Sequence, residues 1–153
     1  MSLQIGSAAA DFALRDQHGQ TVRLTDFAGV RNVALVFYPF AFSGICTREL
    51  CELRDNIDMF VDRDVQLVGV SCDPVHAQRA WAEAEKYEFP LLSDFWPHGA
   101  VAESYGVFDA ETGLATRGTF IIDDRGVVRW KVENAIPDAR DVSEYRKALA
   151  ELS

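Results

Sequence analysis

NVALVFYPFAFSGICTRELCELRDNIDMF, residues 32–60, is the stretch that decides the fold. Residues 33–38 form a continuous apolar run with β-branched and aromatic side chains, which is typical of a strand buried on both faces. Pro39 ends this strand, and Ser43 provides a suitable helix start. Apolar residues then recur at helical spacing over residues 45–60. The stretch therefore predicts a buried strand, a short loop and a helix.

Further strands and helices are expected on both sides of this unit. They are a hairpin within 11–24, a helical turn at 25–27, a buried strand at 65–71, a helix over about 74–87, a short strand within 89–94, a short helix ending near 105, a hairpin of 119–122 with 127–132, and a last helix over about 140–152. This order predicts an α/β fold with a mixed central sheet flanked by helices. A thioredoxin-like fold with an N-terminal hairpin extension fits it, as a single domain over residues 1–153.

The composition excludes some classes of partner and favours a reducing compartment. The net charge of −9 argues against binding to nucleic acids or anionic membranes, which attract basic surfaces. The N-terminal sequence MSLQIGSAAADF lacks the features of a secretory signal, and no apolar run is long enough to span a membrane. We therefore expect a cytoplasmic protein, in which three cysteines serve catalysis, metal binding or packing rather than a disulfide framework.

Cys46 falls in the first turn of the helix that follows the buried strand. Unpaired backbone N–H groups and the helix dipole favour negative charge at this place. A cysteine so placed is held largely as the thiolate, which is the nucleophilic form. The position of Cys46 therefore predicts reactivity.

A reactive thiolate needs donors that orient its substrate and stabilise the charge on the leaving atom. The hydroxyl of Ser43 and the backbone N–H groups of the helix start can serve this purpose. A guanidinium has a fixed fork of donors, and Arg117 is the candidate for this role. The residues expected to shield the pocket from water are Pro39, Phe40 and Phe42.

The pattern Pro39-x-x-x-Ser43-x-x-Cys46 resembles the active-site motif of the peroxiredoxins, the AhpC/TSA superfamily. That motif has Pro, then Thr or Ser, then Cys at this spacing. Glu49 and Arg117, the latter in RGTFIID, also match family positions.

The likeness extends over nearly the whole chain, from GSAAADF at 6–12 to the last helix. Residues 89–108, FPLLSDFWPHGAVAESYGVF, are similar to the one-cysteine alkyl hydroperoxide reductase E subgroup of actinobacteria. Two positions depart from the common pattern. Ala10 stands where many members have Pro, and Ser43 replaces the commoner Thr, which loses a methyl group but keeps the hydroxyl.

The resemblance implies a thiol-dependent peroxidase that reduces hydrogen peroxide and organic hydroperoxides. Cys46 would become a sulfenic acid, and thioredoxin, a mycoredoxin or a low-molecular-weight thiol would complete the reduction. It also implies a homodimer. No flavin, haem, nucleotide or metal cofactor is implied, because neither G-x-G-x-x-G nor a P-loop occurs.

Cys51 follows Cys46 with C-x4-C spacing, which resembles the cysteine pair of the Q-type peroxiredoxins. In an intact helix the two Cα atoms lie roughly 8–9 Å apart, beyond the ~7 Å limit for a disulfide. A Cys46–Cys51 bond thus requires the first turns of the helix to unwind. We expect Cys51 to be the resolving cysteine, and an external thiol is the alternative.

Several alternatives remain open. Glu49 either closes a capping box or orients an arginine. Cys72 is expected to pack in the core, and a zinc site that combines it with His76 has weak support from spacing. Trp81 and Trp96 are expected to pack, or else to wall the active site.

Two other functions compete with the peroxidase. A thioredoxin-type thiol–disulfide oxidoreductase would share the fold but favours C-x-x-C at the helix start, which this chain lacks. A non-enzymatic binding module, such as a chaperone-like assembly, is the third possibility, since fold alone does not decide function.

Overall fold

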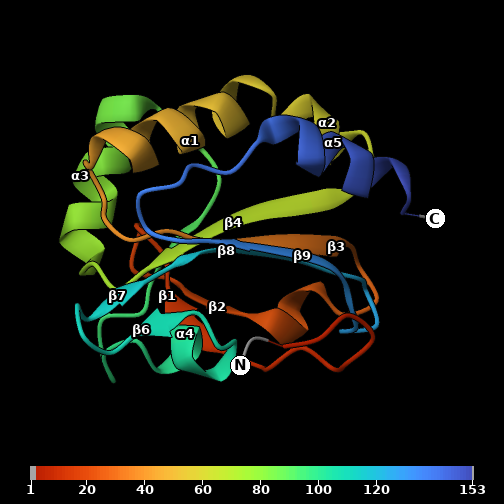
Figure 1. Cartoon of the computed structure of the whole chain (residues 1–153), viewed down its shortest axis with the longest axis horizontal. Coiled ribbons are helices and arrows are strands. Elements are labelled where there is room, and N and C mark those ends of the chain that lie inside the picture. Colours follow the sequence, from red (N-terminus) through yellow and green to blue (C-terminus); the bar gives the residue numbers. More distant parts are fainter. Residues whose placement is uncertain (1–2, 153) are drawn as a thin grey trace.

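The structure, a computed structural model that describes residues 3–152, is built around a mixed sheet in the order β2-β1-β5-β4-β3-β8-β9 (Figure 1). Its strands are β1 (Ala13–Arg15), β2 (Thr21–Arg23), β3 (Asn32–Phe37), β4 (Val65–Ser71), β5 (Leu91–Ser93), β8 (Arg117–Ile122) and β9 (Val128–Asn134). β3, β4 and β5 run parallel, whereas β1, β8 and β9 pair with their neighbours in antiparallel fashion. The mixed sheet is as predicted, and the N-terminal hairpin extends it through β1.

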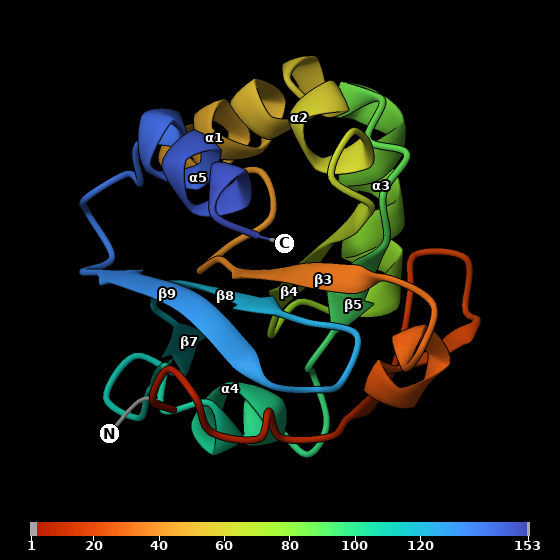
Figure 2. The ribbon, with the colours of Figure 1, turned by 90° about the vertical axis from the view of Figure 1, so that its right-hand side faces the viewer.

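Helices cover both faces of this sheet (Figure 2). They are the 3-10 helix η1 (Leu24–Phe27) and the helices α1 (Gly44–Asp55), α2 (Asp58–Val61), α3 (Val75–Glu85), α4 (Ala100–Ser104) and α5 (Val142–Ala150). In Figures 1 and 2, α1, α2 and α5 lie on one side of the sheet, and α4 lies on the other with the N-terminal segment. Among residues 3–152, no helix is long and apolar enough to cross a membrane.

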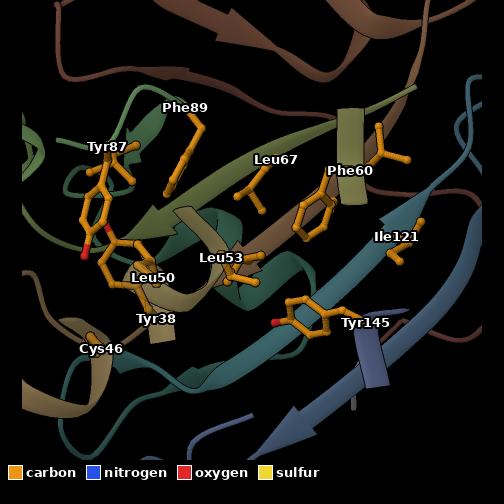
Figure 3. Close-up of a cluster of buried hydrophobic side chains, with 14 of the residues drawn as sticks. Tyr38, Cys46, Leu50, Leu53, Phe60, Leu67, Tyr87, Phe89, Ile121 and Tyr145 are labelled. Atoms are coloured by element: carbon orange, nitrogen blue, oxygen red, sulfur yellow. The ribbon is translucent and has the colours of Figure 1, made fainter. Parts of the chain in front are cut away.

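The protein has two hydrophobic cores, one on each face of the sheet, and the alternating side chains of β3 contribute to both. Ala34 and Val36 belong to the core under α1, α2, α3 and α5, whereas Val33 and Leu35 belong to the core on the α4 side. Such a strand is buried on both faces, which explains its continuous apolar sequence. Figure 3 shows the first of these cores, with Cys46 at one end of it, where α1 begins.

One expectation about local structure was wrong, and one small element was missed. The helix predicted over 45–60 is interrupted, because Asn56 leaves helical geometry and its side chain donates to the carbonyl of Glu52. A two-stranded ribbon of β6 (Phe108–Asp109) with β7 (Leu114–Ala115) was not anticipated. Its strands are two residues long, which is too short to show any periodicity in the sequence.

Candidate active site

Cys46 is the third residue of α1, directly after the loop that leaves β3. Ser43 is the N-cap of this helix, and its Oγ accepts a hydrogen bond from the backbone N–H of Cys46 at 3.2 Å. This N–H group, expected to face a substrate, is therefore used within the helix start. The Ser43 hydroxyl keeps its own hydrogen and is still able to donate. Pro39 is buried two residues after the end of β3.

Arg117 reaches Cys46 from the neighbouring strand. The antiparallel register pairs Val36 of β3 with Thr119 of β8, so the first residue of β8 lies beside the end of β3. Nη1 of Arg117 donates to the sulfur of Cys46 at 3.2 Å, and Nε donates to the carbonyl of Ile136 at 2.6 Å. The guanidinium is thus held on the sulfur, at the place expected from the sequence.

Glu49 lies one turn after Cys46 and binds two arginines. Its Oε1 accepts from Nη1 of Arg117 at 2.7 Å and from Nη2 of Arg140 at 2.9 Å. The capping-box alternative for Glu49 is wrong, because Ser43 caps α1 and the third helical residue is Cys46. Orientation of an arginine, the other alternative, agrees with the geometry.

Arg140 is the residue of this cluster that the sequence did not single out. It precedes Asp141, the N-cap of α5, and is 7 % exposed. Its Nη1 also donates to the carbonyl of Gly118 and to Oγ1 of Thr119, at 2.9 and 3.0 Å. An arginine next to a helix start looks like a surface residue in sequence, so no local signal could have identified it.

The charges in this cluster do not cancel without Cys46. Two buried guanidinium groups, those of Arg117 and Arg140, face the single carboxylate of Glu49. Burial acts to raise the pKa of Glu49, but the hydrogen bonds and charge of Arg140 outweigh it and hold the pKa below its usual value. Glu49 is therefore ionised, and the cluster keeps one unit of positive charge. A thiolate at Cys46 neutralises this charge.

The sulfur of Cys46 has no exposed surface. The loop that leads to it carries Phe40 and Phe42, which are 48 % and 56 % exposed, and Phe42 has a left-handed backbone with φ of 70°. The loop is tied down where the N–H of Ala41 donates to Oδ2 of Asp73 at 2.7 Å. A substrate therefore reaches the sulfur only after a local rearrangement of the residues around Cys46.

The other cysteines lie in different surroundings. All three cysteines are free thiols, and Cys51, which is half-buried, has its sulfur 3.4 Å from Oη of Tyr87. α1 is continuous from Cys46 to Cys51, so the two thiols are not bridged in this conformation. Cys72 is buried at the end of β4, as expected. Burial, with smaller contributions from Asp94 and Asp73, raises its pKa to about 12.

The remaining candidate residues of the active site and of a zinc site differ in burial. Trp81 is buried with its ring 5.1 Å from that of Tyr38, whereas Trp96 is 80 % exposed. His76 is exposed while Cys72 is buried. Across residues 3–152, no three His, Cys, Asp or Glu side chains gather in a way that could hold a metal ion.

The AhpC/TSA family model matches residues 5–131. The chain belongs to this family. It is 44% identical to alkyl hydroperoxide reductase E of Mycobacterium tuberculosis over 151 residues, which are 99% of both chains. It is 33% identical to the chloroplastic 2-Cys peroxiredoxin BAS1 of Hordeum vulgare, with 97% of this chain and 74% of that one covered. The resemblance to the alkyl hydroperoxide reductase E subgroup, noted at residues 89–108, is confirmed.

Solved structures of the family have the same fold. Peroxidoxin BcpB from Mycobacterium tuberculosis superimposes with a TM-score of 0.87 at 34% identity, with 99% of both chains covered. The reduced 2-Cys peroxiredoxin of Plasmodium vivax has a TM-score of 0.88 at 27% identity, with 97% of this chain and 81% of that one covered. The predicted thioredoxin-like fold is therefore confirmed.

Proposed function

We propose that this AhpC/TSA family protein is a thiol-dependent peroxidase in which the Cys46 thiolate reduces hydroperoxides. The observation that carries the proposal is the hydrogen bond of 3.2 Å from Arg117 to the sulfur of Cys46, in a buried cluster with excess positive charge. The thiolate attacks one oxygen of ROOH, an S–O bond forms and the O–O bond breaks. RO⁻ leaves and takes a proton to become ROH, and the sulfur is oxidised to a sulfenic acid.

Each neighbour has a role that its geometry allows. Nη1 of Arg117 stabilises the thiolate, and the same guanidinium stabilises charge on the departing oxygen. Ser43 donates its hydroxyl hydrogen to the peroxide. Pro39 limits the access of water beside the sulfur. Glu49 is a positioning residue, because it holds the guanidinium of Arg117 without reaching the sulfur itself.

The substrates proposed are hydrogen peroxide and organic hydroperoxides. Two observations support the organic ones. The relative with 44% identity is named an alkyl hydroperoxide reductase. In addition, the half-exposed rings of Phe40 and Phe42 lie on the loop that leads to Cys46 and offer apolar contact for an alkyl chain.

We further propose that Cys51 resolves the sulfenic acid and that thioredoxin, a mycoredoxin or a small thiol then reduces the disulfide. The C-x4-C spacing and the partial exposure of Cys51 support this order of steps. α1 must unwind between Cys46 and Cys51 before the bridge can form. Direct attack of an external thiol on Cys46 is the alternative.

A homodimer is proposed through the edge of the sheet where the parallel strands end. Phe42 follows β3 and Trp96 follows β5, so these exposed aromatic residues lie on the same edge. A second copy would bury both. Sedimentation of the reduced chain tests this, and a monomer at micromolar concentration would contradict it. The cytoplasmic location and the single-domain organisation stay predictions.

The decisive experiment follows Cys46 after rapid mixing with one equivalent of hydrogen peroxide or cumene hydroperoxide. Intact mass spectrometry should show a gain of one oxygen, followed by loss of water as a Cys46–Cys51 bridge forms. Cys46→Ser should abolish peroxide consumption, whereas Cys72→Ser, as the matched control, should leave it unchanged. Peroxide consumption by Cys46→Ser at the parent rate would contradict the proposal.

The thioredoxin-type alternative is tested in the same preparation. That chemistry needs two thiols within reach at the helix start, whereas Cys46 and Cys51 are spaced C-x4-C on one continuous helix. We therefore expect no reduction of insulin disulfides in the absence of peroxide. Rapid reduction of insulin would favour the alternative.

A further inference from the structure

The turn of α1 between the two cysteines is hydrogen-bonded to α3 and to the residues that follow it. Tyr87, just after α3, donates its hydroxyl hydrogen to the carbonyl of Thr47 at 3.3 Å. The same hydroxyl lies 3.4 Å from the sulfur of Cys51. Nε1 of Trp81 donates to Oγ1 of Thr47 at 3.3 Å. Three polar contacts from two aromatic residues therefore meet within one turn of helix.

These contacts fall where unwinding has to occur. In an α-helix the carbonyl of Thr47 accepts the N–H of Cys51, so Tyr87 reinforces the same carbonyl that closes this turn. Unwinding of the turn from Thr47 to Cys51 breaks that helical bond and releases the contacts of Tyr87 with it.

The two aromatic residues that contact this turn are themselves buried and packed against each other. Trp81 and Tyr87 are 1 % and 4 % exposed, and their rings meet edge to face with centroids 5.0 Å apart. The ring of Tyr87 also packs 5.3 Å from that of Phe89 (Figure 3 shows Tyr87 and Phe89 in this core). The hydroxyl of Tyr87 is thus held in place by the aromatic packing of its ring.

We propose that Tyr87, supported by Trp81, is a positioning residue that holds the turn from Cys46 to Cys51 wound and thereby sets the rate of disulfide formation. This inference rests on the proposed function of Cys51. In the step concerned, the Cys51 thiolate attacks the sulfenic sulfur of Cys46, an S–S bond forms and the S–O bond breaks. Hydroxide leaves and takes a proton as water, so Cys51 is oxidised and Cys46 is reduced.

The hydroxyl of Tyr87 also determines how long the sulfenic acid survives. While the turn stays wound, Cys51 remains beyond bonding reach of Cys46, and the sulfenic acid is open to an external thiol or to a second peroxide. Removal of the hydroxyl lowers the cost of unwinding and shortens this interval.

The test compares Tyr87→Phe with Tyr105→Phe. The first variant keeps the packed ring and removes only the two contacts to α1. The second is a matched control, since it removes a buried hydroxyl that donates to the carbonyl of Ala10 at 2.6 Å on the α4 side of the sheet. Hydrogen–deuterium exchange of the reduced proteins measures opening of the turn, and quenched-flow mass spectrometry measures the disulfide step.

In Tyr87→Phe, amide exchange within residues 47–51 is expected to rise about three- to tenfold, the ratio that the loss of about one hydrogen bond produces. The disulfide step should accelerate by a similar factor relative to the oxidation of Cys46, and Tyr105→Phe should show neither effect. Unchanged exchange in Tyr87→Phe would overturn the inference.

A slower disulfide step in Tyr87→Phe would also overturn the inference, because the hydroxyl would then assist Cys51 rather than restrain it. A different result tests the proposed function instead. Faster exchange with no Cys46–Cys51 bridge in any of the proteins would overturn the resolving role of Cys51, and would still support the hold of Tyr87 on α1.

Discussion

Three hydrogen bonds join Arg140 to Glu49. The backbone N–H and Nε of Arg140 donate to Oε2 at 2.6 and 3.0 Å, and Nη2 donates to Oε1 at 2.9 Å. Both carboxylate oxygens are therefore occupied, and Oε1 is directed at Arg117 as well. The position of the guanidinium on Cys46 thus depends on a residue that never touches the sulfur.

Replacement of Arg117 should slow the oxidation of Cys46 more than it affects folding. In Arg117→Lys, a single ammonium group replaces the guanidinium, which in the parent donates to the sulfur of Cys46, to Glu49 and to the carbonyl of Ile136. We expect the rate constant with hydrogen peroxide to fall by about 10²–10³, as when one preorganised donor is lost. Stopped-flow measurement checks this, with the exposed Arg79→Lys as control. A loss below tenfold would contradict the role of Arg117.

Glu49→Gln should destabilise the fold because it leaves two buried guanidinium groups without a counter-charge. Removal of one partner from such a pair costs about 3–5 kcal/mol. Urea denaturation at neutral pH measures the change in the free energy of unfolding. Glu83→Gln is the control, since its ion pair with Arg79 is exposed, and it should change stability by less than about 0.5 kcal/mol. Equal effects of the two substitutions would contradict the prediction.

The same carboxylate should make stability depend on pH in the acid range. The pKa of Glu49 in the folded state lies below its usual value of 4.5, since Arg140 outweighs the opposing effect of burial. Near pH 4.5 the unfolded chain therefore binds more protons, so stability rises with pH. The contribution of Glu49 is fully present above pH 4.5 and is lost as pH falls through the folded-state pKa.

The difference in unfolding free energy between the parent and Glu49→Gln, measured from pH 7 to pH 3, isolates this contribution. The subtraction is needed because burial raises the pKa of Asp94, which adds a slope of opposite sign. The difference should be constant near neutrality and should shrink below pH 4.5. A difference that is independent of pH would show that Glu49 does not ionise in the way described.

Ser43→Ala should weaken the start of α1. Its Oγ accepts the N–H of Cys46, and loss of such a cap costs about 1 kcal/mol. The oxidation of Cys46 should slow in parallel, because the substituted side chain no longer positions the cysteine or donates to the peroxide. Ser43→Thr keeps the hydroxyl and should retain both properties. Urea denaturation and stopped-flow rates together distinguish the two, and equal losses in both variants would contradict the capping role.

Cys72 should resist alkylation in the folded protein. Burial and the neighbouring carboxylates of Asp94 and Asp73 raise its pKa to about 12. At pH 8 the thiolate is then roughly one part in ten thousand, and the thiolate is the reactive form. Peptide mass mapping after iodoacetamide should find Cys72 modified only in urea, whereas the partly exposed Cys51 should be modified in the native state as well. Modification of Cys72 as fast as Cys51 would contradict this.

The main elements of the fold follow from local patterns. The strand predicted at 65–71 has the same bounds as β4, and the hairpin within 11–24 forms around Gly19, whose φ of 79° suits a turn. These segments were recognisable because apolar runs and turn residues act through their immediate neighbours. The break at Asn56 was not recognisable, since apolar spacing continues across it to Phe60.

The sequence by itself determined the family, the strand–loop–helix unit and the place of Cys46 at a helix start, since each depends on residues close together in the chain. Tertiary structure alone decided that Arg140, 91 positions after Glu49, completes the charge cluster, and that Tyr87 fastens the turn that carries Cys51. Burial is the physical reason. An arginine or tyrosine has the same sequence neighbours whether it faces water or the core. Only the packing of the sheet and helices determines which buried polar groups form hydrogen bonds with each other.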